Sequence, residues 1–164
     1  MSTFEHPLFG PIDLASAGEW EGTLTFVGAE IDVDLTLDQS STAEPVLLAR
    51  VNLLDKLSLF DKMARVAMVD EMAEGEESAS GLYAVHHAEE LPEAEWKKIF
   101  GSAPEETTEE AFLAQLRLDR VGLYPGDAER CLVLDYTLPG EVTNYVLCVS
   151  IDANGQIEAI DMES

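Results

Sequence analysis

The chain has 164 residues, of which 46% are hydrophobic and 26% charged, and 33 Asp and Glu against nine Lys and Arg give a formal net charge of −24. This length and composition predict one globular domain over residues 1–164 and exclude a disordered chain. The sequence has no apolar run long enough to cross a bilayer and no signal-peptide pattern at its start. We therefore expect a cytoplasmic protein with no membrane partner.

The basic residues are confined to the middle of the sequence, since none precedes Arg50 and none follows Arg130. Carboxylates in both terminal segments therefore lack counter-charges nearby in the sequence. Such a protein is repelled by nucleic acid and attracted to basic proteins, so we expect no nucleic-acid partner. Two explanations of the acidity stay open: solubility or adaptation to a salty cytoplasm, and recognition of a basic protein.

Residues 20–38 alternate between apolar and polar side chains, which predicts a β-hairpin with its turn at Gly28-Ala29. The polar face of this hairpin carries the carboxylates Glu21, Glu30, Asp32 and Asp34. Because the segment contains no Lys or Arg, these four residues form the candidate binding surface of the chain. The alternative is the ordinary solvated face of an antiparallel sheet.

Residues 43–73 show helical periodicity, and Ser58 followed by Asp61 predicts that a second helix begins there with the serine hydroxyl as its cap. Three shorter helices are expected after it. The first contains residues 84–91, and the second begins near Pro92 and ends at Gly101. The third begins after Thr107-Thr108, whose hydroxyls can cap it.

Residues 118–164 return to strand-like alternation, interrupted by turn sequences at Pro125-Gly126, Pro139-Gly140 and Asn154-Gly155. A hairpin, then helices, then further strands predict an α+β fold. We expect an antiparallel β-sheet made of the N-terminal hairpin and the C-terminal strands. Several helices would be inserted between these two parts and packed on one face of the sheet.

The segment A-V-H-H-A-E-E-L at 84–91 contains two of the three histidines. A helical wheel places Leu82, Val85 and Ala88 on its apolar side, and Tyr83, His86, His87 and Glu90 opposite. The wheel therefore predicts that both histidines are exposed and that His86 pairs with Glu90, four residues later.

The alternative interpretation of this segment is a metal or acid–base site formed by His86, His87 and Glu90, which would suit a small metal-assisted hydrolase. The segment lacks the HExxH spacing and offers fewer ligands than the three or four protein groups of a stable zinc site. We therefore expect no metal site and no cofactor. Cys131 and Cys148 lie in apolar runs and are expected to be free, buried thiols.

Four blocks of the sequence resemble a family of bacterial proteins known only as a domain of unknown function. They are L-F-G-P-I-D at 8–13, the Trp20–Leu37 hairpin, the segment from G-L-Y-P-G-D to L-V-L-D-Y-T-L at 122–138, and residues 145–164. The resemblance implies a small bacterial cytosolic domain. It supplies no catalytic or binding residues.

The leading hypothesis from the sequence is a non-enzymatic, acidic protein-interaction or accessory domain. Its sharper form is an immunity-type inhibitor that covers a basic toxin by charge complementarity. The hypothesis from a different class is the metal-assisted hydrolase. The oligomeric state is left open.

Overall fold

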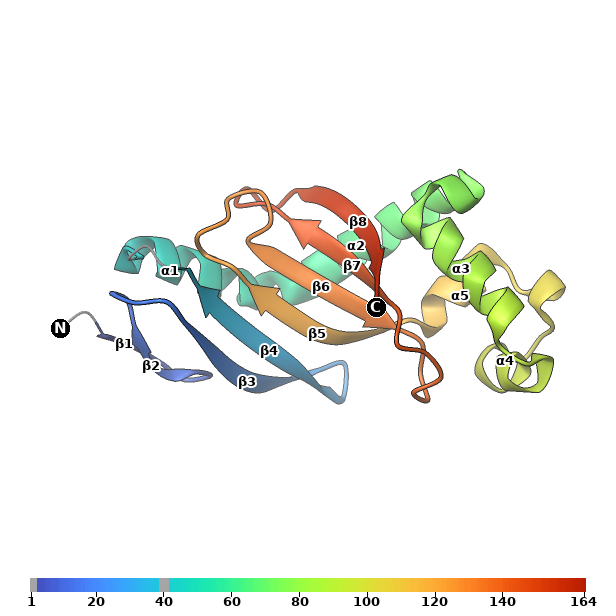
Figure 1. Cartoon of the computed structure of the whole chain (residues 1–164), viewed down its shortest axis with the longest axis horizontal. Coiled ribbons are helices and arrows are strands. Elements are labelled where there is room, and N and C mark those ends of the chain that lie inside the picture. The colour runs from blue at the N-terminus through green and yellow to red at the C-terminus, as the bar shows by residue number, and fades with distance from the viewer. Residues whose placement is uncertain (1–2, 39–41) are drawn as a thin grey trace.

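The computed structural model describes residues 3–38 and 42–164, and its main element is a six-stranded mixed sheet with the strand order β3-β4-β5-β6-β7-β8 (Figure 1). The strands are β3 (Gly18–Phe26), β4 (Ala29–Leu37), β5 (Arg117–Leu123), β6 (Leu132–Thr137), β7 (Val146–Ile151) and β8 (Ile157–Glu163). Before them, β1 (Thr3–His6) and β2 (Gly10–Asp13) form a separate two-stranded antiparallel sheet.

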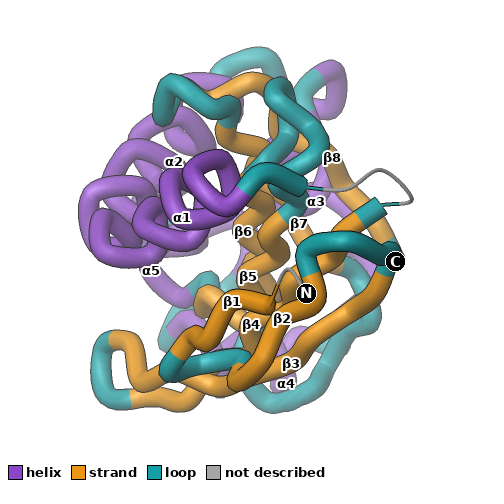
Figure 2. The backbone as a smooth tube through the Cα atoms, turned by 90° about the vertical axis from the view of Figure 1, so that its left-hand side faces the viewer, coloured by secondary structure: helices purple, strands orange, loops and turns teal. Residues whose placement is uncertain are grey.

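The helices lie between β4 and β5 in the chain, as the sequence predicts, and the α+β class is confirmed. They are α1 (Glu44–Val51), α2 (Leu57–Met72), α3 (Ala79–Glu90), α4 (Glu93–Phe100) and α5 (Glu109–Gln115), with short 3₁₀ segments η1 (Asn52–Lys56), η2 (Gly75–Glu77) and η3 (Pro104–Glu106). Helices α1 and α2 lie on one side of the strands, whereas α3 and α4 lie beyond one end of the sheet (Figures 1 and 2). None of the described helices is long and apolar enough to span a bilayer.

The strands β4 and β5 pair in parallel, with Asp32 opposite Arg120 and Leu35 opposite Leu123. All other neighbouring strands in the sheet pair antiparallel. The expected antiparallel sheet is therefore correct except at this one junction. Alternation along β4 does not distinguish the two directions, because it reports which face is buried and not how the strand is oriented beside its neighbour.

The predicted hairpin is β3–β4, and its alternation is confirmed. Ile31, Val33, Leu35 and Leu37 are all buried. The turn lies at Val27 and Gly28, one residue earlier than expected, because Phe26 pairs with Ala29. Both turn residues have positive φ, 51° for Val27 and 76° for Gly28. This conformation matches the twist of a two-residue hairpin, but it is strained for a β-branched residue such as Val27.

The expected helix start at Ser58 is wrong, because α2 already begins at Leu57 and Ser58 is an exposed residue inside its first turn. The preceding residues tighten into the 3₁₀ segment η1, so the chain stays coiled between α1 and α2 without a side-chain cap. Two other predicted signals are confirmed. Thr108 accepts a hydrogen bond from the Ala111 amide at the start of α5, and Gly101 ends α4 with a φ of 76°.

The hydrophobic core lies between the helix layer and one face of the sheet. Its strand side chains include Leu35, Val121, Leu134 and Val149, and its helix side chains include Leu47, Phe60, Ala64 and Met68. Burial of each larger aliphatic or aromatic side chain stabilises the fold by about 1.5–3 kcal/mol. Cys131 and Cys148 are buried and free, as predicted. The opposite face of the sheet, here called the open face, carries no described helix. The predicted carboxylates lie on it, because they alternate along β3 and β4 with the residues that face the core.

The strained turn gives a test of the hairpin geometry. Replacement of Val27 by Asn should raise the free energy of unfolding by about 1 kcal/mol, because Asn tolerates the left-handed conformation that a β-branched residue resists. Val27 is 85% exposed, so little packing is lost. Urea unfolding of the variant measures the gain. The control, Thr25→Asn, changes a neighbouring exposed strand residue and should not stabilise; an equal or lower stability of Val27→Asn would contradict the turn assignment.

Candidate functional site

The structure places the four predicted carboxylates on the same open face of the β3–β4 hairpin. Glu21 lies directly opposite Asp34, and Glu30 lies opposite Thr25. Glu21, Glu30 and Asp32 are exposed, whereas Asp34 is half-buried. The alternation that buries Val33 and Leu35 on the core face therefore displays these carboxylates to solvent on the other.

Arg120 on β5 is a residue of this surface that the sequence reasoning missed. The parallel register brings it opposite Asp32, and its Nε donates to the Asp34 carboxylate. Its Nη1 donates to Asp135 Oδ2 at 3.1 Å, and its Nη2 donates to the hydroxyl of Tyr124 at 3.2 Å. Burial opposes the charge of Arg120, but Tyr124 and Asp34 outweigh it and raise its pKa. Arg120 therefore stays cationic, and each of its three guanidinium nitrogens donates one hydrogen bond.

The carboxylates of the hairpin differ in their pairing as a result. Asp34 is neutralised by Arg120, whereas Glu21, Glu30 and Asp32 have no ion-pair partner within residues 3–38 and 42–164. A hollow of about 690 Å³, here called the acidic hollow, is lined by Pro7, Leu8, Glu21, Asp32, Asp34 and Arg120 among others. Three of the four predicted residues therefore meet at one hollow, and Glu30 lies outside it.

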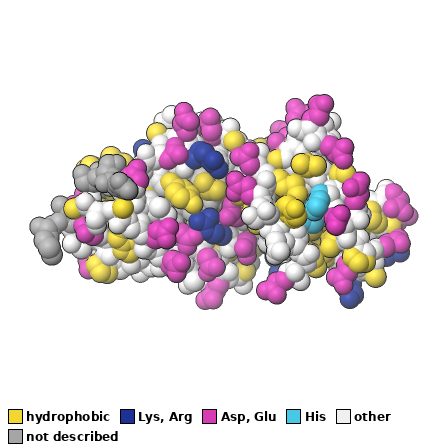
Figure 3. All heavy atoms as spheres, in the orientation of Figure 1, with side chains coloured by type: hydrophobic (Ala, Val, Ile, Leu, Met, Phe, Trp, Pro, Cys, Tyr) yellow, Lys and Arg dark blue, Asp and Glu magenta, His cyan; other side chains and the backbone are white. Residues whose placement is uncertain are grey.

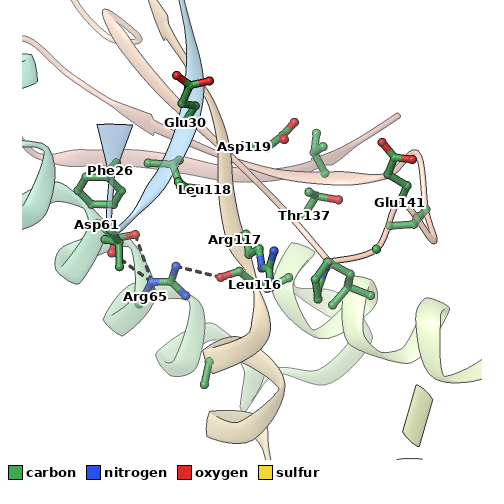
Figure 4. Close-up of a pocket in the computed structure, with 18 of the residues that line it drawn as sticks. Phe26, Glu30, Asp61, Arg65, Leu116, Arg117, Leu118, Asp119, Thr137 and Glu141 are labelled. Atoms are coloured by element: carbon green, nitrogen blue, oxygen red, sulfur yellow. Dashed lines mark hydrogen bonds and ion pairs between the residues drawn. The ribbon is translucent and has the colours of Figure 1, made fainter. Parts of the chain in front are cut away.

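Glu30 lies instead at the edge of a larger cavity of about 1260 Å³, here called the Arg65 cavity. Figure 4 shows that Asp61 and Arg65 approach each other from α2 within it, whereas Glu30 stands on the strand away from them. Arg65 Nη1 and Nη2 each donate at 2.9 Å, to the carbonyls of Leu113 and Leu116.

The charged pair in the Arg65 cavity has a structural role. Arg65 Nε lies 3.1 Å from Asp61 Oδ1, which also accepts a hydrogen bond of 2.7 Å from the Tyr136 hydroxyl. Burial and the adjacent Asp61 carboxylate raise the pKa of Tyr136, so its hydroxyl remains a donor. Arg65 donates to two carbonyls at the C-terminal end of α5, those of Leu113, which also accepts from the Leu116 amide, and of Leu116. The network thus joins α2, α5 and β6.

Helix α3 buries a different face from the one predicted. Tyr83 and His87 are 0% and 1% exposed, whereas Leu82 is 42% exposed. The prediction that His87 is exposed is therefore wrong, and His86 is only half-exposed. The wheel failed because it counted Tyr83 and His87 as polar, although each has an apolar ring that packs in the core and a polar tip that finds a partner.

The polar atoms of the buried face of α3 are satisfied by its own backbone and by the loop between β6 and β7. The Tyr83 hydroxyl donates to the Tyr145 carbonyl at 2.8 Å. His87 Nδ1 lies 2.7 Å from the Tyr83 carbonyl, so Nδ1 is the protonated nitrogen and Nε2 accepts from the Thr143 hydroxyl, also at 2.7 Å. Burial lowers the pKa of His87 and raises that of Tyr83 to about 12. Both rings are neutral at pH 7.

The expected His86–Glu90 pair is replaced by a ring contact, because His86 packs against Tyr145 with their centroids 4.7 Å apart. Both nitrogens of His87 are already hydrogen-bonded, and Glu90 is exposed. Among the described residues, no group of three or more His, Cys, Asp or Glu is arranged to hold a metal ion. The histidines of this segment instead connect helix α3 to the loop between β6 and β7, His87 through Thr143 and His86 through Tyr145.

A third cavity, here called the Arg130 cavity, lies on the open face and was also missed. Its volume is about 610 Å³, and its lining includes Arg120, Tyr124, Arg130, Val133, Asp135, Cys148 and Glu163. In Figure 3, basic side chains near the middle of this face lie beside hydrophobic atoms, and acidic side chains surround them. Two of the nine basic residues of the chain, Arg120 and Arg130, therefore line a cavity on an otherwise acidic face.

Cys148 at the floor of the Arg130 cavity is a neutral thiol. It is 2% exposed, lies opposite Asp135 in the β6–β7 pair and donates to Glu163 Oε2 at 3.2 Å. Burial together with the two carboxylates raises its pKa. The thiolate form required for nucleophilic attack is therefore disfavoured, and Cys148 serves as a hydrogen-bond donor.

Loss of the Arg65 network should destabilise the fold strongly. Arg65→Met should lower the free energy of unfolding by about 2–3 kcal/mol, because it leaves Asp61 and two carbonyls without their charged donor. The control is Lys97→Met, since Lys97 and Glu93 form a helix pair of the same spacing with side chains 54% and 60% exposed. That change should cost about 0.5 kcal/mol or less. Urea unfolding compares the two; equal losses would contradict the structural role.

The buried, neutral His87 should make stability depend on pH. Its folded-state pKa is below its ordinary value of 6.5, so below pH 6.5 the unfolded chain binds a proton that the folded chain does not. Stability should therefore fall as the pH decreases through this value, by at most about 1.4 kcal/mol per pH unit from this group. His87→Gln should reduce the change of the free energy of unfolding with pH, from pH 7.5 down to the pH at which the protein unfolds in acid.

His6 acts in the same direction, because partial burial lowers its pKa too. His6→Gln therefore serves as the common background, and urea unfolding across this pH window supplies the slopes. An unchanged slope in the His87→Gln variant would contradict the neutral, buried state of this ring.

Comparison of the chain with protein-family models, with curated protein sequences and with solved structures gave no match. The resemblance described above stays a prediction, and the candidate site rests on its own geometry.

Proposed function

We propose that the protein is a non-enzymatic interaction domain that binds a basic protein through the open face of the β3–β4 hairpin. The contact residues are Glu21, Glu30 and Asp32. The observation that carries the proposal is that these carboxylates are exposed and have no ion-pair partner in the described part of the chain, while the nearby Arg120 is occupied by Asp34 and Asp135.

The charge of this surface is not offset by the sequence around it. No Lys or Arg precedes Arg50, so β1 to β4 contribute carboxylates alone. Carboxylates on a rim exposed to water attract a basic partner over a Debye length of about 8–10 Å and set its orientation more than its final affinity. The binding that we propose is therefore fast and salt-sensitive.

β3 is the first strand of the six-stranded sheet, and the segment between β1 and β2 lies against its middle, where a Cβ atom on Gly22 would be 2.8 Å from the Leu8 carbonyl oxygen. Side chains on the open face, and not an added strand, therefore provide the contact surface that we propose. Glu21 belongs to this edge strand, and Asp32 lies on the strand next to it. An immunity-type inhibitor of a basic enzyme is one case of such binding.

The experiment must test whether the position of the carboxylates on the hairpin matters, and not only the total charge of the protein. The variant Glu21→Gln, Glu30→Gln, Asp32→Asn removes three charges from the open face. Titration of the ¹⁵N-labelled protein with a deca-lysine peptide at low salt should give amide shifts centred on β3 and β4. The variant should bind about tenfold more weakly, which corresponds to roughly 1.4 kcal/mol for three surface contacts.

The control variant removes the same charge elsewhere, with Glu74→Gln, Glu76→Gln and Glu77→Gln in the exposed connection after α2. It should weaken peptide binding by about twofold or less, because only the general field of the protein changes. Equal weakening by both variants, or shifts spread over the whole surface, would show that the acidity serves solubility and would overturn the proposal.

A further inference from the structure

Residues 44–72, which form α1, η1 and α2, are nearly neutral in a strongly acidic chain. They contain four Lys and Arg against five Asp and Glu, a net charge of −1, whereas all other residues together carry −23. Two copies of a chain with a net charge of −24 repel each other, and a contact through this segment adds least to that repulsion. The segment also contains four of the seven large hydrophobic side chains that are exposed within residues 3–38 and 42–164: Val46, Leu48, Leu59 and Val66.

Helix α2 presents to solvent a row of residues at spacings of three and four, here called the α2 stripe: Leu59, Lys62, Val66 and Asp70. Leu59 is 53% exposed and Val66 is 61% exposed. The buried residues of α2 lie on the opposite side of the helix and belong to the core against the sheet. In Figure 2 the helix layer is at the outside of the molecule, with the sheet on its inner side.

The charges of the α2 stripe are not used inside the chain. Lys62 and Asp70 are exposed and take part in none of the ion pairs among the described residues. Eight positions separate them, about 12 Å along the helix, so they are too far apart to pair with each other. Asp61 and Arg65 on the flank of the stripe are already paired with each other. The stripe therefore has a cation on one side of Val66 and an anion on the other.

An antiparallel pair of α2 helices from two copies matches this pattern. With a two-fold axis at Val66, residues equally far before and after Val66 face each other. Lys62 of each copy then lies beside Asp70 of the other, with each residue about 6 Å along the helix from the axis. A parallel pair would instead place like charges together. The order of charges along the stripe is thus complementary to itself in the antiparallel orientation.

We propose that the chain forms a symmetric dimer in which the α2 stripes of two copies pack antiparallel about an axis at Val66. Leu59 and Val66 supply the apolar contacts, and Lys62 and Asp70 form an ion pair twice across the axis. A single helix pair is a small interface, so the dimer dissociates in the micromolar range. The stripe is on the helix side of the sheet, so the acidic hairpin of each copy stays accessible on the open face.

Sedimentation equilibrium of the full chain, from about 5 to about 500 µM in 150 mM NaCl, tests the dimer. At this salt concentration the Debye length of about 8 Å screens the repulsion between the copies. The mass should rise with concentration from the 17.9 kDa of the monomer toward twice that value. Val66→Glu places a carboxylate beside its own copy at the axis and should weaken the dimer at least tenfold.

The matched control for this variant is Val27→Glu, which makes the same change at an exposed valine of the hairpin turn. It should leave the dissociation constant of the dimer within about twofold, because Val27 is far in the sequence from the stripe and on another element.

Charge exchange across the axis tests the orientation of the two helices. Lys62→Asp and Asp70→Lys should each weaken the dimer about tenfold, because each change creates two like-charge contacts. The double variant Lys62→Asp, Asp70→Lys should return the dissociation constant to within about threefold of the original. The single changes alter the net charge in opposite directions, so a general effect of charge would weaken one dimer and strengthen the other.

The proposal is overturned if the chain is monomeric over the whole concentration range, or if Val66→Glu leaves a dimer intact, since that dimer would use another surface. It is also overturned if the double variant does not recover association. Recovery in the double variant excludes misfolding as the cause of the losses in the single variants. The mass measurement does not involve a basic protein, so its outcome is independent of binding at the β3–β4 hairpin.

Discussion

Parallel neighbours in a sheet cannot be joined by a tight turn, because the chain must return to the end of the sheet where the first strand began. In this protein the connection between β4 and β5 contains every described α-helix. The long helix α2 lies against one face of the sheet, and the remaining strands follow as antiparallel neighbours. Because the crossover supplies no helix to the other face, that face is left to polar side chains and to the hollows between them.

The same junction determines the electrostatics of the open face. The parallel register brings Arg120 beside Asp34 and Asp135, which come from strands on either side of β5. A half-buried guanidinium between two carboxylates is stable here because each of its three nitrogens donates to an acceptor, Asp34, Asp135 or Tyr124. The open face is therefore divided into three parts. Arg120 and its partners form a paired centre, and the hairpin on one side of it carries unpaired carboxylates. The Arg130 cavity lies on the other side of Arg120.

Local patterns predicted the elements whose signals depend on neighbouring residues alone, such as the alternation of the hairpin, the Thr108 cap and the Gly101 helix end. The face of α3 could not be predicted in this way, because the burial of His87 depends on Thr143, 56 positions away. The Arg130 cavity was also out of reach, since β5, β6, β7 and β8 all contribute to it. A usable signal was present, however: Asp135 and Ser150 are polar residues inside strands that are otherwise almost wholly apolar.

The parallel junction also has a consequence for how the chain folds. Strands β5 to β8 form a meander of sequence neighbours, and β3 and β4 form a local hairpin, so both parts need only short loops to close. Their union joins residues as distant as Asp34 and Arg120, 86 positions apart, and the loop-closure entropy of the whole helical segment opposes it. The contact that shapes the open face is thus among those of greatest sequence separation, and the β4 edge of the hairpin stays unpaired until β5 has joined it.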